Sequence, residues 1–385
     1  MNLNFINQFV QNAFALETGE GCMRYVTENK KKADFEAVIA AFGEQGCNPA
    51  QRREIGENLF ATFRFDDGDV AVSYFNYNHT LCFVTDRLIG RVAPPLAAQE
   101  CEHLTAPKLC FLDLQSPEAV KEGNGLGMVY VLSDGSFIVY DGGFFDDGEG
   151  LIAFLEAHNV REEKPRIAAW VLTHSHGDHY FAMKRIAARY ADKITVENFV
   201  LSVRNKVYEH EQYEPYLNEH FETDALPHFE GAKVVRPHTG QVLCYRDAYI
   251  EILSTQEEIL PSHFRWLNET SIVSRVFLGG QSVFMPADAE LGVDVMIPSI
   301  YGDALKSDFI QETHHGFSGG SYTMYDLVRP RVAFWTCQGA TFAKYCQPQY
   351  NNGYNYYLKN MVVENYHYGM GDVVLELPYV PGTKE

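Results

Sequence analysis

The sequence lacks any uninterrupted apolar run of the roughly 18 residues that a membrane-spanning helix requires. The segment from Met1 to Leu16 contains no Lys or Arg ahead of its apolar residues, so it does not have the pattern of a secretory signal peptide. We therefore expect a cytoplasmic protein with no membrane partner.

Closely spaced cysteines are also missing, because the eight cysteines include no CxxC pair and form no tight framework. Such scattered cysteines in a chain of 385 residues are typical of free thiols in a reducing compartment. The sequence contains no internal repeat and no low-complexity tract. Its 46% apolar and 21% charged residues are those of a folded globular protein and exclude general disorder.

Basic residues are few: the sequence has 31 Lys and Arg but 51 Asp and Glu, which gives a formal net charge of -20. This excess of carboxylates repels a nucleic-acid backbone, so we expect a small-molecule substrate and no long nucleic acid as partner. The segment from Glu209 to Glu230 has seven acidic residues and no Lys or Arg. It is interpreted either as a loop beside a cleft or as a solvated surface loop.

The N-terminal part has the pattern of an α+β segment. Residues 31–42 place apolar side chains at helical spacing, and Asn-Pro-Ala opens a second predicted helix over 48–59. Two apolar-alternating runs over 60–65 and 70–77 flank an Asp-Asp-Gly-Asp turn and predict a β-hairpin. Residues 80–85 predict a third strand.

Residues 91–107 lack periodicity and contain three prolines, which indicates a boundary between two domains. We therefore divide the chain into an N-terminal α+β domain, residues 1–105, and a second domain, residues 106–385. The first domain contains no motif to which chemistry can be attached. Three roles stay open for it: covering a cleft, mediating a homodimer, or enlarging the core.

The second domain alternates short strands and helices, as layered α/β domains do. Strands over 128–132 and 136–140 are predicted to form a hairpin around Asp134-Gly135. A helix over 151–158 and a buried strand over 167–173 follow.

The most informative run is His174-Ser175-His176-Gly177-Asp178-His179, directly after the predicted buried strand. In a loop leaving a strand, His174 and His176 can converge on one cation while Asp178 and His179 turn toward a second. Imidazole nitrogens and a carboxylate are a ligand set that Zn²⁺ accepts. The run therefore predicts a metal site with one or two ions.

This His-x-His-x-Asp-His run at the end of a strand resembles the signature of the metallo-β-lactamase-fold hydrolases. The resemblance covers about residues 108–385 and implies a four-layer αββα sandwich of the α/β class, with the N-terminal α+β part as an extension. It also implies that Asp141, in Asp141-Gly142-Gly143, ends an early strand beneath the site and supports it without being a ligand.

The resemblance assigns two later positions. Asp288, at the end of a predicted hairpin strand, is expected to bridge the two metals. Taken alone, the residue is better explained as the cap of the helix that begins near Ala289, and the His174 to His179 run reverses that preference. His314, at the end of a predicted strand over 308–313, is expected to complete the shell of the second metal. His315 then faces the substrate or supports the ligands, and we count it with Asp178 as catalytic.

The family's middle histidine, which completes the first metal's shell, has no clear counterpart. The histidines in the relevant interval do not follow convincing strands: His210, His220, His228, His238 and His263. The first metal is then left with His174, His176, Asp288 and water. Zn²⁺ is the expected ion, with Mn²⁺ and Fe as alternatives, and Ser175 stands where oxygen-reducing di-iron members usually have Glu.

A protein-bound Zn²⁺ lowers the pKa of its water to about 7, so the expected function is a hydrolase that uses a metal-activated hydroxide oriented by Asp178. The runs around Asn268, Asp288 and His314 resemble the hydrolase domain of bacterial competence DNA-internalisation proteins, which favours a small phosphodiester or ester-type substrate. The alternatives are an acyl-ester, lactone or thioester hydrolase, and a non-catalytic metal-binding regulatory protein.

Seven tyrosines lie between Tyr345 and Tyr368. They are interpreted either as a stacking platform for a base or sugar or as ordinary core and rim residues. His367 has the same two interpretations, as a cleft residue or as a surface residue.

Overall fold

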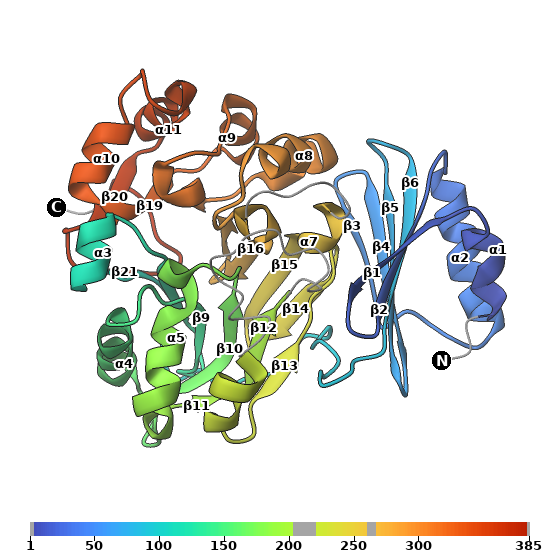
Figure 1. Ribbon diagram of the computed structural model, residues 1–385, viewed down its shortest axis with the longest axis horizontal. Coiled ribbons are helices and arrows are strands. Elements are labelled where there is room, and N and C mark those ends of the chain that lie inside the picture. The colour runs from blue at the N-terminus through green and yellow to red at the C-terminus, as the bar shows by residue number, and fades with distance from the viewer. Residues whose placement is uncertain (1–3, 203–220, 260–266, 383–385) are drawn as a thin grey trace.

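The computed structural model describes residues 4–202, 221–259 and 267–382. No helix within these ranges is long and apolar enough to cross a membrane. The strands of the same ranges form three sheets. Figure 1 shows the first sheet at one end of the long axis of the molecule and the other two together at the opposite end.

The first sheet is antiparallel and comes from the N-terminal part of the chain, with the order β1-β2-β6-β5-β4-β3. Its strands are β1 (Phe14–Gly19), β2 (Cys22–Thr27), β3 (Gln51–Ile55), β4 (Asn58–Phe65), β5 (Gly68–Phe75) and β6 (Thr80–Asp86). The helices α1 (Asn7–Val10) and α2 (Lys32–Glu44) lie on its outer side (Figure 1).

Both faces of this sheet are covered, so every residue of β5 is buried. On the outer face the ring of Phe42 in α2 stacks on Phe63, with ring centroids 3.7 Å apart. On the inner face Phe60 and Phe75 belong to the same apolar cluster as Ile300 of α8 (Leu291–Tyr301). The N-terminal sheet therefore shares a core with the rest of the chain.

The helix predicted over 31–42 is confirmed by α2, and the hairpin and third strand are confirmed by β4, β5 and β6. The helix predicted over 48–59 is wrong, because this segment forms β3 and the start of β4. Gly56, with a φ of 60°, lies in the turn between the two strands. The Gln51 side chain donates to the carbonyls of Leu96 and Val242. These residues are distant in sequence, so local sequence cannot reveal the contacts that hold β3 in place. The prediction also misses β1 and β2.

The second and third sheets are mixed. The second has the order β13-β12-β10-β9-β8-β7-β21, with β11 beside β10, and the third runs β14 to β20 in chain order. The strands of the second sheet are β7 (Lys108–Phe111), β8 (Gly127–Val131), β9 (Phe137–Asp141), β10 (Arg166–Leu172), β11 (Thr195–Val196), β12 (Asn198–Leu201), β13 (Lys233–Val235) and β21 (Val373–Glu376). Those of the third are β14 (Val242–Tyr245), β15 (Ala248–Ser254), β16 (Val273–Leu278), β17 (Gln281–Met285), β18 (Phe309–Gln311), β19 (Val332–Gln338) and β20 (Glu364–Tyr368).

These two sheets face each other across the main apolar core, which contains Val139 and Trp170 of the second sheet and Val276 and Phe334 of the third. Helices cover both outer sides (Figure 1). Those of the second sheet are α3 (Pro117–Glu122), α4 (Asp147–His158) and α5 (Gly177–Arg189), and those of the third are α8, α9 (Tyr322–Val328), α10 (Gly339–Tyr345) and α11 (Tyr354–Met361). The predicted α/β fold, a four-layer αββα sandwich with an N-terminal α+β extension, is confirmed.

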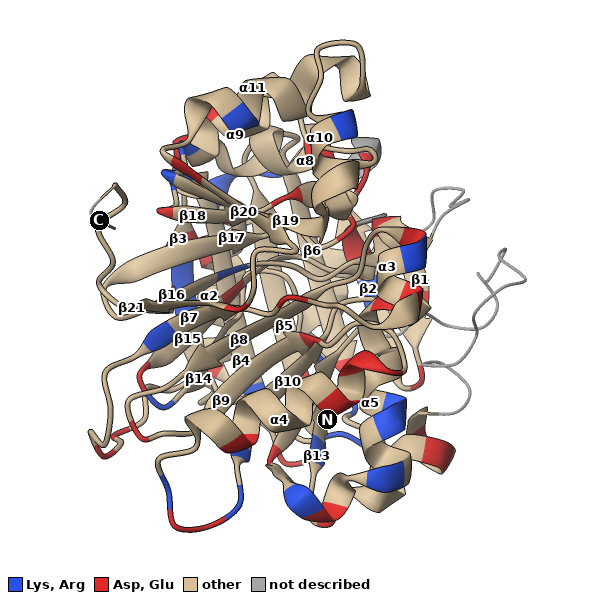
Figure 2. Ribbon diagram, turned by 90° about the vertical axis from the view of Figure 1, so that its left-hand side faces the viewer, with Lys and Arg blue, Asp and Glu red and all other residues tan. Residues whose placement is uncertain are grey.

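Charged residues on the helices of the second sheet are paired rather than segregated. Figure 2 shows basic residues of α5 beside acidic residues of α4, where Arg185 Nη2 lies 2.7 Å from Glu149 Oε1. In the same region Lys193 Nζ lies 3.2 Å from Glu156 Oε1. The described part of this surface therefore presents both signs of charge.

The two parts of the chain meet along a continuous contact. β6 ends at Asp86 and β7 begins at Lys108, and the residues between them form no described helix or strand. Across the contact, the Asn58 side-chain amide donates to the Ile300 carbonyl at 2.7 Å. The division at residues 105 and 106 stays a prediction.

Gly240 makes the closest approach in this contact, because an added Cβ would lie 1.9 Å from Cδ1 of Phe60, and its φ is 86°. We expect Gly240→Ala to lower the free energy of unfolding by about 2–5 kcal/mol, from backbone strain and overpacking together. Gly231→Ala is the matched control, since its φ is 75° and nothing lies within 4 Å of the added Cβ. Urea unfolding followed by circular dichroism tests this, and equal losses in the two variants would contradict it.

Candidate metal centre

The predicted site residues follow strands whose carboxyl ends meet at one edge of the two central sheets. β10 runs parallel to β9, and β17 runs parallel to β18. Asp141 ends β9, and His174 comes shortly after β10. Asp288 and His315 come shortly after β17 and β18. Residues far apart in the sequence are thereby brought to one place.

The backbone at these strand ends is strained. Four non-glycine residues have positive φ: Asp141 (53°), Ala287 (52°), His314 (44°) and His315 (54°). Each such conformation costs on the order of 1–3 kcal/mol and persists only where other contacts hold it. The Ala287 N–H, for example, donates to the side-chain oxygen of Gln311 at 2.8 Å. Strain of this kind concentrates at functional sites.

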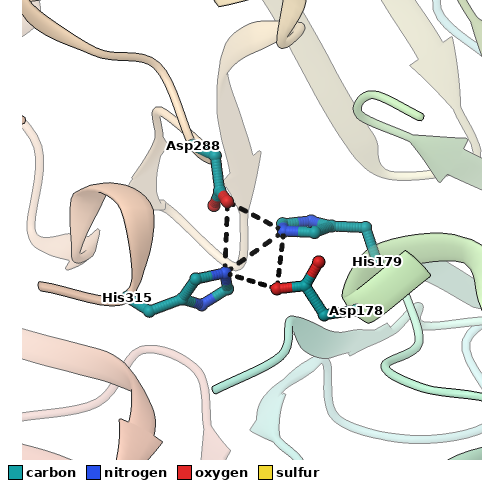
Figure 3. A group of neighbouring side chains, drawn as sticks. All are labelled: Asp178, His179, Asp288 and His315. Carbon is teal, nitrogen blue, oxygen red and sulfur yellow. Dashed lines mark hydrogen bonds and ion pairs between the residues drawn. The ribbon is translucent and has the colours of Figure 1, made fainter. Parts of the chain in front are cut away.

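The larger donor group consists of Asp178, His179, Asp288 and His315 (Figure 3). His179 Nε2 and His315 Nε2 each lie 3.1 Å from Asp288 Oδ2. His315 Nε2 is also 3.1 Å from Asp178 Oδ2, and the two Nε2 atoms are 3.3 Å apart. Two imidazoles and two carboxylates therefore point at a common centre.

The opposite ring nitrogens fix how these imidazoles are oriented. His179 Nδ1 lies 2.8 Å from the Asp141 carboxylate, and His315 Nδ1 lies 3.0 Å from the Thr336 carbonyl, so each Nδ1 carries a hydrogen. The two Nε2 atoms then face each other and the carboxylates, where protons or a bound cation can balance the carboxylate charge. Asp288 Oδ1 is buried without a hydrogen-bond partner. The donor set fits a bound divalent metal ion with supporting groups behind each imidazole.

The imidazoles and carboxylates of this group shift one another's pKa values. Burial by itself raises the pKa of Asp288, but His179, His315 and His314 hold it well below its usual range. The pKa of Asp178 is also held low against burial, by His179 and His315. Burial lowers the pKa of His315, but Asp288 and Asp178 raise it to about 9. The carboxylates are therefore ionised at neutral pH, as metal ligands must be.

The smaller donor group consists of His174, His176 and Asp288. His174 Nε2 lies 3.0 Å from His176 Nδ1 and 3.8 Å from Asp288 Oδ2. Burial, together with His179 and His176, holds the pKa of His174 well below its usual value, so this imidazole is neutral and able to bind a metal. Asp288 belongs to both groups, which is the arrangement expected of a bridging ligand.

The adjacent residues His314 and His315 lie differently with respect to the larger donor group. His315 enters the larger donor group and is fully buried, whereas His314 Nε2 is 3.9 Å from Asp288 Oδ2. His314 Nδ1 instead lies 2.7 Å from the Ser318 hydroxyl and 3.2 Å from Glu290. The reason is the backbone, because the left-handed turn at both histidines sends the second one inward. We therefore propose His315 as the ligand and place His314 beside the group.

None of the five candidate middle histidines is placed in the smaller donor group by the described residues. His210, His220 and His263 lie outside the described residues. His228 ends a short 3-10 helix, and His238 is buried against Glu257 and Asp86 rather than against His174. Within the described residues the smaller donor group therefore contains only its three members.

Two supporting residues carried no signal in the sequence. The Asn124 amide donates to Asp178 Oδ2 at 2.8 Å, and Thr336 holds the outer nitrogen of His315. Asn124 pairs with Cys337 through an isolated β-bridge, and Thr336 lies inside β19. Both are brought to the site by non-local pairing.

Comparison with known proteins identifies the family. The family model of the metallo-β-lactamase superfamily matches residues 123–322. The chain belongs to the metallo-β-lactamase superfamily. A comparison with curated proteins finds no match.

Solved structures similar to this superfamily member include three at 12% sequence identity. YhfI from Bacillus subtilis, a metallo-β-lactamase fold protein, has a TM-score of 0.42 with 71% of this chain and 100% of that chain covered. The diiron β-hydroxylase CmlA from Streptomyces venezuelae has a TM-score of 0.40 with 72% and 55% covered. The short form of human tRNase Z has a TM-score of 0.40 with 70% and 99% covered. The chain thus spans about half the length of CmlA.

A cavity of about 570 Å³ opens beside the candidate metal centre of this metallo-β-lactamase-fold protein. His176 and Asp178 line it from the metal side. The remaining lining residues combine aromatic rings with acidic and amide groups: Phe144, Phe181, Phe317, Glu118, Glu122, Asn124 and Gly177. Lys184 lies over the ring of Phe181, with Nζ 4.9 Å from the ring centroid, but is not among the lining residues.

The late tyrosines and His367 do not line this cavity. Tyr366 and Tyr368 are buried. Tyr366 stacks on Phe334, and Tyr368 stacks on Phe111. His367 Nδ1 lies 2.8 Å from the Tyr368 carbonyl. For Tyr366 and Tyr368 these contacts favour core packing over a stacking platform.

Glu312 lies fully buried just before the two histidines, and burial raises its pKa from 4.5 to about 8 although Tyr325 donates a hydrogen bond to it. The folded protein therefore keeps a proton that the unfolded chain releases between these two values. We expect the free energy of unfolding to fall with pH across that window, by up to about 1.4 kcal/mol per pH unit from this residue. Glu312→Gln should remove that part of the slope.

Urea denaturation of both proteins at several values between about pH 5 and about pH 8 measures this slope. Tyr325→Phe is the control, since it removes the hydrogen bond but leaves the carboxyl buried, so the slope should persist. A slope unchanged in Glu312→Gln would contradict the assignment.

Proposed function

We propose that the protein is a metal-dependent hydrolase of a small ester-type substrate. The convergence of His179 Nε2 and His315 Nε2 on the carboxylates of Asp178 and Asp288 is the observation that supports this most strongly. Such a donor set, buried and backed by hydrogen-bonded Nδ1 atoms, has the composition of a metal site rather than of a surface ion pair.

The larger donor group would hold one divalent ion, and His174, His176 and Asp288 would hold a second. A bound ion such as Zn²⁺ supplies a water of lowered pKa and a Lewis acid for the oxygen of the substrate. Asp141 and Thr336 keep the two imidazoles of the larger group in fixed orientations. Fixed orientation of this kind is what lets a site act without reorganising during the reaction.

Asp178 is the residue that links the donor group to the cavity. Its Oδ2 atom lies 3.1 Å from His315 Nε2 and accepts a hydrogen bond from Asn124, and both Asp178 and Asn124 line the cavity. Its pKa is held low, so it is ionised at neutral pH and can accept a hydrogen bond from a nucleophilic water. Asn124 positions the carboxylate for this role.

The cavity composition supports an uncharged or weakly charged substrate with an apolar group. Phe144, Phe181 and Phe317 offer apolar contact, whereas Glu118 and Glu122 repel anions. The volume of about 570 Å³ is in the range of small-molecule sites. These features favour a carboxyl ester, lactone or thioester over a phosphodiester, and they disfavour a long nucleic acid.

A substrate panel tests the proposal. Metal-replete protein would be assayed with p-nitrophenyl esters, lactones, thioesters and bis(p-nitrophenyl) phosphate, with Asp178→Asn as the inactive control. We expect ester-type substrates to be hydrolysed at least 10-fold faster than the phosphodiester, and chelation to abolish both activities. The opposite preference would favour a phosphodiesterase. No turnover in metal-loaded protein would favour a non-catalytic metal-binding protein.

A further inference from the structure

A third group of metal-ligating side chains lies away from the two groups of the candidate metal centre, where the N-terminal sheet meets the rest of the chain. Cys22 begins β2, His238 follows β13, and Glu257 lies in α7 (Gln256–Ile259). All three are buried, with exposed fractions of 0%, 1% and 1%. One donor atom from each lies within 4.8 Å of the others.

The distances fit one ion. His238 Nδ1 lies 3.0 Å from Glu257 Oε1, and Cys22 Sγ lies 3.7 Å from the same oxygen. Donors at ordinary Zn–N, Zn–O and Zn–S bond lengths in a tetrahedral site are separated by about 3.3–3.6 Å. The two observed separations lie on either side of this range. The Thr18 hydroxyl donates to Cys22 Sγ at 3.3 Å.

The other ring nitrogen of His238 is supported as it is in metal-binding histidines. His238 Nε2 lies 3.3 Å from Asp86 Oδ2, and Arg236 Nη1 lies 3.3 Å from Asp86 Oδ1. When Nε2–H donates to a carboxylate, the Nδ1 lone pair is directed to the opposite side. Here that side faces Cys22 and Glu257.

The charges also balance in both states. Without an ion, the His238 imidazolium neutralises Glu257, and Cys22 is a neutral thiol. A divalent cation M²⁺ would replace two protons, one from the thiol and one from His238 Nδ1, with formation of M–S, M–N and M–O bonds and release of 2 H⁺. The thiolate and the Glu257 carboxylate then neutralise M²⁺, and the Asp86–Arg236 pair is unchanged. Binding therefore adds no net charge to the buried site.

We propose that Cys22, His238 and Glu257 form a separate structural site for one divalent cation of the Zn²⁺ type. The thiolate gives it a preference for zinc or cobalt over magnesium or calcium. Its ligands come from the N-terminal sheet and from two segments of the hydrolase part, so the ion ties the two together. This gives the N-terminal extension a defined role that its own sequence does not reveal.

Cobalt is the most direct probe, because a cysteine thiolate bound to Co²⁺ gives a near-ultraviolet charge-transfer band. Among the described residues, neither donor group of the candidate metal centre contains a cysteine. Co²⁺ would be added to chelator-stripped wild-type protein and to Asp288→Asn. We expect the band in both proteins, its loss in Cys22→Ser, and its retention in Cys110→Ser, a buried thiol of β7. Absence of the band from the wild type, or its survival in Cys22→Ser, would overturn the proposal.

A second measurement covers the case in which Cys22→Ser does not fold. X-ray absorption of zinc-loaded Asp288→Asn protein, with Cys22 intact, should show one sulfur at about 2.3 Å from the metal. A zinc spectrum with nitrogen and oxygen ligands alone would overturn the site. Because Asp288 is absent from this group, the result is independent of the proposed hydrolase activity.

Discussion

Replacing Asp288 with asparagine is expected to lower kcat/KM at least about 100-fold. Removing a residue that only supports a metal ligand typically costs about 10- to 100-fold, and Asp288 is itself a proposed ligand. Asp288 is the member common to both donor groups, and its Oδ2 atom lies 3.1 Å from two imidazole nitrogens. Asparagine keeps the shape but removes the charge that four histidines face. Metal content by plasma mass spectrometry should fall together with turnover.

Asp294→Asn is the matched control for this prediction. Asp294 is also buried, in the adjacent helix α8, but burial and the neighbouring Glu312 raise its pKa well above the usual range. It lies outside both donor groups, so asparagine should leave turnover and metal content nearly unchanged. The assignment of Asp288 would be wrong if Asp288→Asn kept both metal and turnover within 10-fold of the wild type.

Asp141→Asn is expected to weaken metal binding by about 10- to 100-fold, the usual effect of removing the group behind a metal-binding histidine. The Asp141 carboxylate accepts from His179 Nδ1 at 2.8 Å and from the Thr173 hydroxyl at 2.6 Å. Its charge makes the Nε2 atom of His179 a better ligand. Asparagine tolerates the positive φ of 53° at this position, so the backbone should be preserved.

Competition with a chelator of known affinity measures this change. Asp147→Asn is the control, because Asp147 is buried and accepts from the backbone N–H groups of Ser116 and Phe144 without touching a histidine. It should alter stability but not metal affinity. Unchanged metal affinity in Asp141→Asn would show that Asp141 has only a structural role.

The part of the site that lies in one continuous run was predictable from the sequence. His174, His176, Asp178 and His179 follow a buried strand, and strand ends are where parallel sheets place functional groups. The choice between His314 and His315 was not predictable, because it depends on left-handed backbone at both residues. Sequence spacing places both histidines after the strand and cannot say which one turns inward.

The N-terminal part shows the same limit. The apolar-alternating run over 70–77 predicts a strand, and β5 forms there, although the structure buries it on both faces. Residues 51–55 are mostly polar, and their strand is fixed by pairing with β4 and by contacts of Gln51 with a distant segment. The proposed site of Cys22 and Glu257 joins residues 235 positions apart, which only the fold can reveal.

The central claim, hydrolysis that depends on ions held at the candidate metal centre, is tested most directly by zinc reconstitution. Chelator-stripped protein would be titrated with Zn²⁺ while hydrolysis of the best ester substrate is followed, in the wild type and in Asp288→Asn. We predict no turnover without metal, recovery to a plateau in the wild type, and no recovery in the variant. Turnover that is unaffected by stripping, or equal recovery in Asp288→Asn, would contradict the account.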